Sequence, residues 1–310
     1  MKAVRLHARG GVEQLIYEEA PLPVLQPGDA LVRVLACSTT RNELDWDPTY
    51  TDQQGNSRLP AIPGHELCGI VEALAPGVQD LAVGDAVYGL ASFFRDGAAA
   101  EYIAIHAADL APKPMSLDAI QAAAVPLSAL TAWQALFDHA RLLPGQKLLV
   151  HGAAGGVGSF AVQIGRWHGV HVIATADCDS LDLVTGLGAD QFIDYKTQRF
   201  DEMASEVDVV LDTVGGETQE RSWKVLRKGG TLVSIAGESI EQPDPALGVK
   251  GIFFIVKPNR MQLIELGRLI DQEIIKPLIS SVLPLDQARE AFGQVAGHGV
   301  KGKVVLRIAQ

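Results

Sequence analysis

Two hydrophobic patterns divide the chain. Up to about residue 115, short apolar runs alternate with Gly- and Pro-containing turns such as Pro27-Gly28-Asp29. Many short strands with such turns are typical of a compact barrel or sandwich. The predicted strands are 31–35, 69–73, 86–90 and 101–105. The polar, turn-rich segment 47–60 predicts an exposed loop.

From residue 116 to about 275, strand-like and helix-like segments alternate. Nearly continuous apolar strands spaced by helices predict a parallel sheet that is covered on both faces. Ser116 is the expected cap of the first helix. The predicted strands are 148–150, 170–175, 191–193, 207–211, 231–235 and 251–256, and the predicted helices are 117–125, 128–141, 159–168, 181–187, 218–226 and 261–271.

The tail returns to the first pattern, with strands at 279–283 and 303–308 around a helix at 285–295. We therefore predict an α/β protein of two domains. Residues 1–115 and 276–310 form the β-rich domain. Residues 116–275 form a doubly wound parallel-sheet domain.

The segment 148–158, LLVHGAAGGVG, is the most informative motif. An apolar strand runs into a glycine cluster and then a helix, which places backbone N–H groups and a helix N-terminus where a dinucleotide pyrophosphate can bind. The motif is a variant of G-x-G-x-x-G, because Ala153 replaces the first glycine while Gly155 and Gly158 keep the other two. Alanine weakens the argument for a tight turn at that position.

Composition narrows the class of protein. The 310 residues are 47% hydrophobic and 20% charged, as in a globular protein with a large core. A net charge of −11 argues against nucleic-acid binding. Three scattered cysteines (Cys37, Cys68 and Cys178) favour free thiols in a reducing compartment. With neither a signal-peptide pattern nor a long apolar run, we expect a cytoplasmic protein without membrane contact.

The glycine turn resembles that of the medium-chain dehydrogenase/reductase superfamily, in its zinc-independent quinone oxidoreductase (zeta-crystallin-like) branch. Further matching motifs follow in the family's order along nearly the whole chain. They are Pro63-Gly64-His65-Glu66, Val83-Gly84-Asp85-Ala86-Val87-Tyr88-Gly89, Leu130-Thr131-Ala132-Trp133, Leu187-Gly188-Ala189-Asp190 and Gly302-Lys303-Val304-Val305-Leu306.

This resemblance implies a GroES-like N-terminal domain, a Rossmann domain and a nicotinamide in the cleft between them. It implies hydride transfer from NADPH to a small-molecule quinone or α,β-unsaturated carbonyl, and a homodimer formed through the last Rossmann strands. Two alternatives stay open: a zinc-dependent alcohol dehydrogenase, and a non-catalytic NADPH-binding sensor or structural protein.

The cysteine count argues against zinc. A structural site needs four close thiolates, which three distant cysteines cannot supply. His65 and Glu66 match catalytic ligand positions of the zinc enzymes, but Cys37 falls a few residues short of the cysteine ligand, and no cysteine lies near Ser128. We therefore expect no metal, with His65 as a turn histidine that is hydrogen-bonded beneath the cleft.

Without a metal, hydrogen-bond donors must meet the charge that develops on the substrate oxygen. The branch carries cleft-lining residues after the strand at 31–35, where this chain has Asn42, Asp45 and Tyr50. Tyr50 could donate its phenol proton, although it could also be a surface aromatic. Thr131 is expected to contact the nicotinamide or its phosphate.

The choice of NADPH or NADH depends on the end of the second Rossmann strand, where an acid marks NAD-specific units. Ala176 occupies that position, which permits a 2′-phosphate, yet Asp177 and Asp179 follow. Ser180 stands where many family members carry lysine, Tyr195 matches a tyrosine at the adenosine phosphate, and Lys196 or Arg199 could supply a cation. We expect NADPH, with NADH not excluded.

The remaining cofactor contacts follow from the resemblance and from the position of strand ends at the carboxyl edge. Core packing alone is the alternative for the apolar strand ends. The expected contact residues are Ala154, Gly155, Gly156, Val157, Thr175, Thr213, Val214, Ala236, Gly237, Phe254, Ile255 and Lys303, with Lys301 as an alternative to Lys303.

Overall fold

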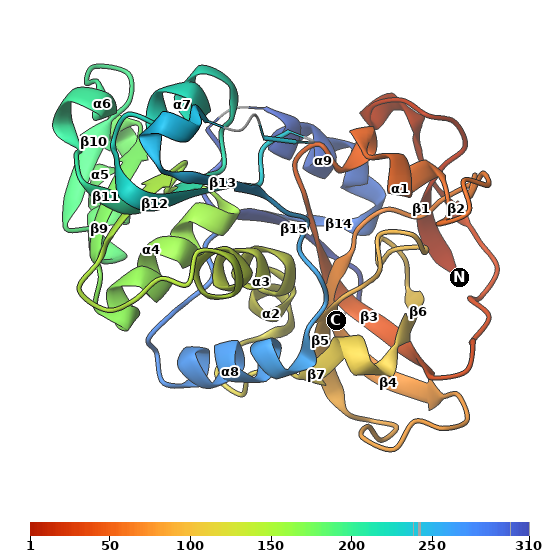
Figure 1. Cartoon of the computed structure of the whole chain (residues 1–310). Helices are drawn as coiled ribbons and strands as arrows, with labels where there is room; N and C mark the ends of the chain where they lie inside the picture. The colour runs from red at the N-terminus through yellow and green to blue at the C-terminus, as the bar shows by residue number, and fades with distance from the viewer. Residues whose placement is uncertain (238, 241–242, 298, 310) are drawn as a thin grey trace. The chain divides into compact units, whose positions relative to one another are not determined.

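The computed structural model describes residues 1–237, 239–240, 243–297 and 299–309. Contacts divide the chain into two compact units (Figure 1). Unit 1 comprises Met1–Leu127, Lys257–Glu273 and Pro277–Gln310, and unit 2 comprises Ser128–Val256 and Ile274–Lys276. The domain limits inferred from the sequence describe segments that fold independently, which contact-based units do not test. Those limits stay a prediction.

Unit 2 is built on a six-stranded, fully parallel sheet of order β10-β9-β8-β11-β12-β13. The strands are β8 Lys147–His151, β9 His171–Ala176, β10 Gln191–Asp194, β11 Val207–Asp212, β12 Leu226–Ser234 and β13 Lys250–Phe253. The chain therefore winds outward from β8 in one direction and from β11 in the other. Such sheets bind ligands at the carboxyl ends of the strands, where the winding reverses.

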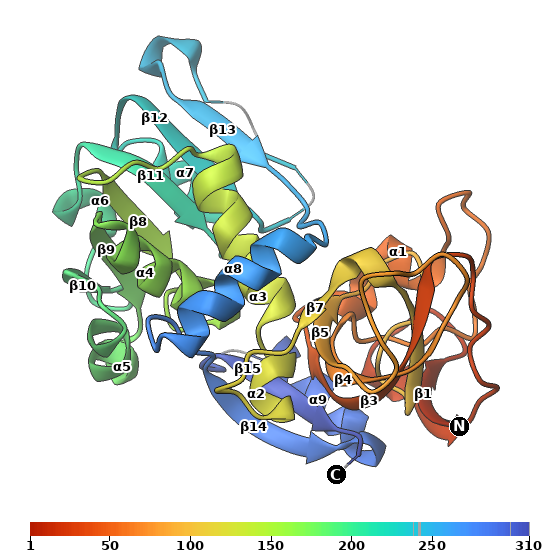
Figure 2. The ribbon, with the colours of Figure 1, turned by 90° about the horizontal axis from the view of Figure 1, so that it is seen from below.

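Helices cover this sheet, as Figure 2 shows from a second direction. They are α4 Gly156–His168, α5 Leu181–Gly186, α6 Phe200–Met203 and α7 Gly216–Ser222, preceded by α3 Pro126–Trp133 and a π-helical turn η4 Gln134–His139. Helix α4 contacts β8 and β9, and α7 contacts β11 and β12. The predicted βαβ unit around the glycine motif is confirmed.

Unit 1 holds a seven-stranded sheet of order β14-β15-β3-β4-β5-β7, with β6 paired to β3, and a separate β1–β2 pair. Its strands are β1 Lys2–Leu6, β2 Leu15–Glu19, β3 Asp29–Thr39, β4 Glu66–Leu74, β5 Ala86–Leu90, β6 Tyr102–His106, β7 Leu110–Pro112, β14 Ile279–Pro284 and β15 Lys303–Arg307. Because β15 pairs with β3, the tail rejoins the first unit, as predicted. The α/β fold class is thus confirmed.

Shorter elements complete unit 1: α1 Asp47–Tyr50, α2 Ala119–Ala123, α8 Arg260–Asp271, α9 Ala288–Ala296 and the 3₁₀ turns η1 Val12–Gln14, η2 Glu43–Asp45, η3 Ala107–Asp109 and η7 Leu285–Gln287. Unit 2 adds η5 Cys178–Ser180 and η6 Pro245–Leu247. Helix α8 groups with unit 1 through contacts such as the hydrogen bond from the Tyr88 hydroxyl to the Leu263 carbonyl, 2.5 Å.

Several predicted details are wrong for local physical reasons. Asp118, rather than Ser116, caps α2, since its carboxylate accepts the Gln121 amide in a capping box. Ser116 instead donates to Asp271. The helix predicted at 218–226 ends at Ser222, and the strand predicted at 251–256 ends at Phe253. Segment 47–60 is partly folded, because α1 buries Tyr50.

Candidate functional site

Helix α4 begins at the carboxyl end of β8 without a side-chain cap. Its N-cap is Gly155, which offers no side chain to the first helical N–H groups, and the first turn carries no acid. The first N–H groups of a helix lack intrahelical partners and attract anions. The predicted contact residues Ala154, Gly155, Gly156 and Val157 are half-buried here and thus accessible.

The glycine that the tight turn needs is Gly152, which precedes Ala153. Gly152 has φ +70, a left-handed conformation that suits glycine, whereas Ala153 does not. Gly158 is needed for a different reason: a Cβ there would lie within 2.8 Å of the Ala153 Cα and closer still to the Gly152 carbonyl. The alanine at position 153 is therefore compatible with the dinucleotide turn.

A buried carboxylate, that of Asp212, connects the ends of β11 and β12. Asp212 is fully buried at the end of β11, and its oxygens accept from the amides of Val214 and Gly215 at 2.9 Å, from Gln219 at 3.0 Å and from Ser234 at 2.9 Å. The Thr213 hydroxyl donates to the His151 carbonyl at 2.8 Å. These bonds fix the backbone of the predicted contact residues Thr213 and Val214.

Large apolar side chains stay exposed just beyond three strands of this edge. Tyr195 follows β10, Val214 follows β11 and Ile255 follows β13, with 58%, 56% and 64% of their surfaces exposed. They follow strands spread over the width of the sheet, from β10 at one side to β13 at the other, so each is a separate exposed apolar position at the carboxyl ends of the strands. All three are predicted cofactor contacts.

Asp177 and Lys196 pair at the carboxyl ends of β9 and β10. The Lys196 Nζ lies 3.5 Å from an Asp177 oxygen, and Ser180 donates to the other oxygen at 3.2 Å. The negative charge of Asp177 makes the largest contribution to the raised pKa of Lys196. Of the two candidate cations, Lys196 therefore lies beside the end of β9, where NADPH and NADH are distinguished. Arg199 instead pairs with Asp201 and Glu202.

Other predicted cofactor residues of unit 2 lie on or near this edge. Thr175 is the penultimate residue of β9, and Ala236 and Gly237 follow β12. Phe254 is buried with its ring 4.3 Å from that of His139. Thr131 is buried in α3. No ligand contact is tested for these residues, so their roles stay predictions.

In unit 1, Lys303 forms a buried ion pair with Glu66. Their charged atoms are 2.5 Å apart, and Glu66 also accepts from the Ser38 hydroxyl at 2.5 Å and the Leu127 amide at 2.9 Å. Lys303 stays a predicted cofactor contact, but its ammonium group already has a partner. Because these donors occupy both Glu66 oxygens, Glu66 is poorly placed to bind a metal.

The residues around His65 make a weak donor set for zinc. Within the described ranges, no group of three or more His, Cys, Asp or Glu side chains could hold a metal ion. At the position of His65 the neighbouring potential ligand is Glu43, and one imidazole plus one acid is a poor zinc site. Burial raises the pKa of the Cys37 thiol, which disfavours the thiolate that zinc requires.

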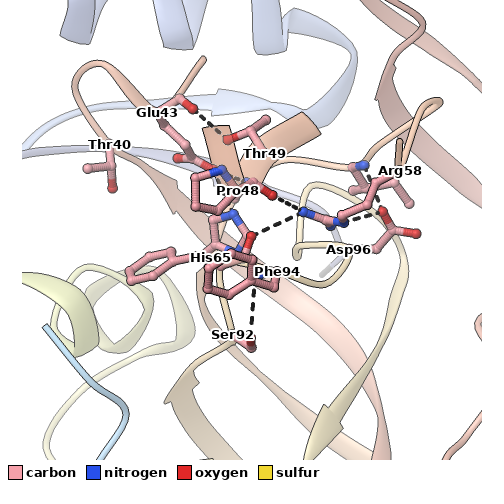
Figure 3. Close-up of polar contacts among 12 residues, drawn as sticks. Thr40, Glu43, Pro48, Thr49, Arg58, His65, Ser92, Phe94 and Asp96 are labelled. Atoms are coloured by element: carbon pink, nitrogen blue, oxygen red, sulfur yellow. Dashed lines mark hydrogen bonds and ion pairs between the residues drawn. The ribbon is translucent and has the colours of Figure 1, made fainter. Parts of the chain in front are cut away.

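His65 and Glu43 form a buried pair that the sequence analysis did not identify (Figure 3). The His65 Nε2 lies 3.6 Å from Glu43 Oε1, which also accepts from the Gly64 amide at 2.5 Å. Burial lowers the pKa of His65 to about 3 and raises the pKa of Glu43 to about 7. Glu43 Oε2 and His65 Nδ1 are buried without a hydrogen-bond partner. Nothing in the sequence around Glu43 indicates this pairing, because it arises from tertiary contact.

Arg58 is a second buried polar residue of this region. Its guanidinium donates to the carbonyls of Pro48 and Phe93. It also lies 3.5 Å from an Asp96 oxygen, and Figure 3 shows Arg58 between Pro48 and Asp96. The Phe93 ring contacts His65 edge-on at 5.1 Å. Arg58 therefore ties segment 47–60 to the loop that packs against His65.

The three predicted substrate-binding residues sit in one short segment. Asn42 is exposed and precedes the 3₁₀ turn that ends at Asp45, also exposed. Tyr50 is only 3% exposed. Its hydroxyl donates to the Leu44 carbonyl at 2.5 Å and lies 3.1 Å from the Gly10 carbonyl. Asn42 and Asp45 thus offer accessible polar groups, whereas the Tyr50 proton is used within the fold.

A doubly wound sheet with an uncapped helix at its switch point defines a dinucleotide-binding protein. Two family models match the chain: "Alcohol dehydrogenase GroES-like domain" over residues 26–115 and "Zinc-binding dehydrogenase" over residues 187–306. The described residues include no helix that is long and apolar enough to cross a membrane.

Individual relatives agree with these models. The chain is 34% identical over 93% of its length to "Probable zinc-binding oxidoreductase, mitochondrial" of Arthroderma benhamiae, covering 91% of that protein. It is 31% identical over 99% of its length to "NADPH-dependent alkenal/one oxidoreductase, chloroplastic" of Arabidopsis thaliana, covering 79% of it. The quinone oxidoreductase structure from Coxiella burnetii superposes with a TM-score of 0.91 at 28% identity, over 99% of both chains.

The chain therefore belongs to the medium-chain dehydrogenase/reductase superfamily, in its quinone oxidoreductase-like branch.

Proposed function

We propose that this protein is an oxidoreductase that transfers a hydride from NADPH to a quinone or an α,β-unsaturated carbonyl without zinc. The observation that carries the proposal is the uncapped N-terminus of α4 at the switch point of the parallel sheet, in a chain related to alkenal/one and quinone oxidoreductases. NADPH, when bound, supplies the hydride.

Different residues of unit 2 would bind different parts of the cofactor. The amides at the start of α4 would bind the pyrophosphate, because they have no intrahelical partners. Lys196 and Tyr195 would lie by the adenosine phosphate, and the apolar surface of Val214 and Ile255 would cover the rest of the edge. Lys196 favours NADPH over NADH, because its ammonium group can turn from Asp177 to a 2′-phosphate.

Unit 1 would supply the groups that meet charge on the substrate oxygen. Asn42 is the accessible candidate donor, and Asp45 would orient a neighbouring group, since a carboxylate only accepts hydrogen bonds. Tyr50 would have to break its bond to the Leu44 carbonyl before it could donate a proton. A hydrogen bond to the developing oxyanion contributes more in the transition state than in the ground state. These roles are proposals.

The same proposal includes a homodimer in a reducing compartment such as the cytoplasm. Strand β13 is an edge of its sheet among the described strands, where it pairs with β12, and an edge strand is where a second copy could pair. The three cysteines are free, with Cys37 and Cys68 buried and Cys178 exposed. Light scattering on purified protein tests the dimer, and fractionation of the source cells tests the compartment.

The activity test is a direct assay. Purified protein is mixed with NADPH and, separately, with a panel of naphthoquinones, alkenals and enones, and oxidation of the reduced nicotinamide is followed by absorbance. We expect turnover with at least one acceptor class, a lower rate with NADH, and no loss after treatment with a chelator. Tight NADPH binding without turnover of any acceptor would favour a sensor, and stoichiometric zinc with chelator-sensitive alcohol oxidation would favour an alcohol dehydrogenase.

A further inference from the structure

His151 is a buried histidine next to the dinucleotide turn, and the proposed function assigns it no role. It is the last residue of β8, directly before Gly152, and is 1% exposed. Its Nδ1 lies 3.0 Å from the Thr175 hydroxyl, and its Nε2 lies 3.0 Å from the Ser222 hydroxyl. The ring also contacts Phe200 edge-on at 4.5 Å. One imidazole therefore connects β8, β9 and α7.

The hydroxyl of Ser222 determines which ring nitrogen carries the proton. The Ser222 oxygen lies 2.6 Å from the Thr218 carbonyl oxygen, and two oxygens at that distance need a proton between them. Because a serine has one hydroxyl proton, Ser222 must accept the bond from His151. The proton of the neutral ring is then on Nε2.

The same logic continues to Thr175. If Nε2 carries the proton, Nδ1 has a lone pair and must accept the hydroxyl proton of Thr175. A neutral ring is what its surroundings favour: burial lowers the pKa of His151 to about 4, Asp212 opposes this and Arg221 adds to it. Asp212 itself is satisfied by four donors. The chain of bonds thus has one direction, from Thr175 through His151 and Ser222 to the Thr218 carbonyl.

We infer that His151 is a positioning residue for the dinucleotide site, which holds the end of β9 and helix α7 to the glycine turn through Thr175 and Ser222. This inference rests on the proposed dinucleotide site. Thr175 is only 3% exposed, so the role of its hydroxyl here is to bond the His151 ring and fix the end of β9.

The backbone adds a second connection between the same elements. The Ala153 amide donates to the Thr175 carbonyl at 3.0 Å, and the Thr213 hydroxyl donates to the His151 carbonyl at 2.8 Å. Ala153 thus holds the glycine turn to β9, and the His151 carbonyl holds it to the residue that follows β11. Loss of its side chain would leave two buried hydroxyls without their partner.

The first arm of the test measures the tautomer in the wild-type protein without cofactor. Two-bond proton–nitrogen correlation spectra of protein labelled with ¹⁵N-histidine distinguish the two neutral tautomers from the charged ring. We expect the Nε2–H form for His151 at neutral pH. An Nδ1–H form or a charged ring would overturn the inference.

The second arm measures NADPH affinity by calorimetry in His151→Phe, His151→Gln and Thr175→Val. We expect the dissociation constant to rise about tenfold in His151→Phe and in Thr175→Val, less than additively in the double variant, with partial rescue in His151→Gln because its amide can donate to Ser222. Gln163→Leu is the matched control: it removes buried bonds to the Ser159 and Lys276 carbonyls two turns along α4, and should leave the constant unchanged.

The outcomes separate this inference from the proposed function. A wild-type protein that binds no dinucleotide would overturn both. NADPH binding that is unchanged in His151→Phe and Thr175→Val, or effects of the two substitutions that simply add, would overturn the inference alone.

Discussion

The His65 Nε2 lies 3.6 Å from the Glu43 Oε1, and both side chains are at most 1% exposed. Glu43 is held by the Gly64 amide through the same oxygen, while its other oxygen has no hydrogen-bond partner. The pair is neutral when Glu43 is protonated, since His65 has a pKa of about 3. Burial therefore disfavours the ionised form of Glu43 relative to its protonated form.

This arrangement predicts an opposite pH dependence for the two residues. The raised pKa of Glu43, about 7 against 4.5, stabilises the fold below pH 4.5 and loses that contribution as the pH rises through 7. The lowered pKa of His65 has the reverse effect, because the unfolded state takes up its proton first as the pH falls below 6.5.

Glu43→Gln should therefore become more stable than wild type as the pH rises from 5 to 8, by up to about 3 kcal/mol. Glutamine keeps an oxygen for the Gly64 amide and has no charge to bury. Urea unfolding at several pH values measures this difference, with exposed Asp80→Asn as the control, which should show none. A difference that does not depend on pH would mean that Glu43 is not buried as an acid with a raised pKa.

The Lys196–Asp177 pair predicts how the cofactor is chosen. Lys196→Ala should raise the dissociation constant of NADPH about fivefold to tenfold with little effect on NADH, since only the 2′-phosphate needs the ammonium group. Asp177→Asn should lower the constant for NADPH, because a repelling charge is lost. Arg199→Ala is the control, since Arg199 pairs with Asp201 and Glu202. Equal losses for both cofactors in Lys196→Ala would contradict this assignment.

Tyr50→Phe distinguishes a proton donor from a structural residue. We expect a loss of about 1 kcal/mol in the free energy of unfolding, because the buried Leu44 carbonyl loses its partner. We expect kcat to stay within about threefold of wild type. Thermal unfolding and steady-state kinetics measure the two effects. A fall in kcat of about a hundredfold with unchanged stability would instead make Tyr50 the proton donor.

The Lys303–Glu66 ion pair predicts strong coupling between two substitutions. Lys303→Met alone should destabilise the protein by about 3–5 kcal/mol, because it leaves the buried Glu66 charge unpaired. Adding Glu66→Gln should recover part of that loss. Denaturant unfolding of both single variants and the double variant gives the coupling energy. If Lys303 also contacts cofactor phosphate, NADPH affinity will fall in Lys303→Met and stay low in the double variant.

The fold could be predicted from the chain because its signals are local. Apolar runs such as 148–150 and the glycine turn that follows indicate a strand and a helix N-terminus without tertiary information. The prediction was wrong where contacts with other residues determine the structure. Asp118, rather than Ser116, caps α2 because Gln121 completes a capping box. Leu226 belongs to β12 because it pairs with β11.

The site could be predicted only in part, for the same reason. The strand order predicts that Thr213 and Val214 follow a strand at the carboxyl edge, and the structure places them directly after β11. The role of Tyr195 rests on the family resemblance and stays a prediction. Glu43 pairs with His65 across 22 residues of sequence, and His151 acquires its tautomer from Ser222, 71 residues later. Such pairs depend on tertiary packing, and neither pattern nor spacing indicates them.

The most direct test of the account is NADPH binding and oxidation in Gly155→Asp compared with Gly186→Asp. Aspartate at the N-cap of α4 should keep or raise stability, because it caps the free N–H groups, yet its charge occupies the proposed pyrophosphate site. Gly186 has open space around it in α5. We predict that Gly155→Asp stays folded with NADPH affinity and turnover at least tenfold lower, while Gly186→Asp retains both. Unchanged NADPH binding in a folded Gly155→Asp protein would contradict the account.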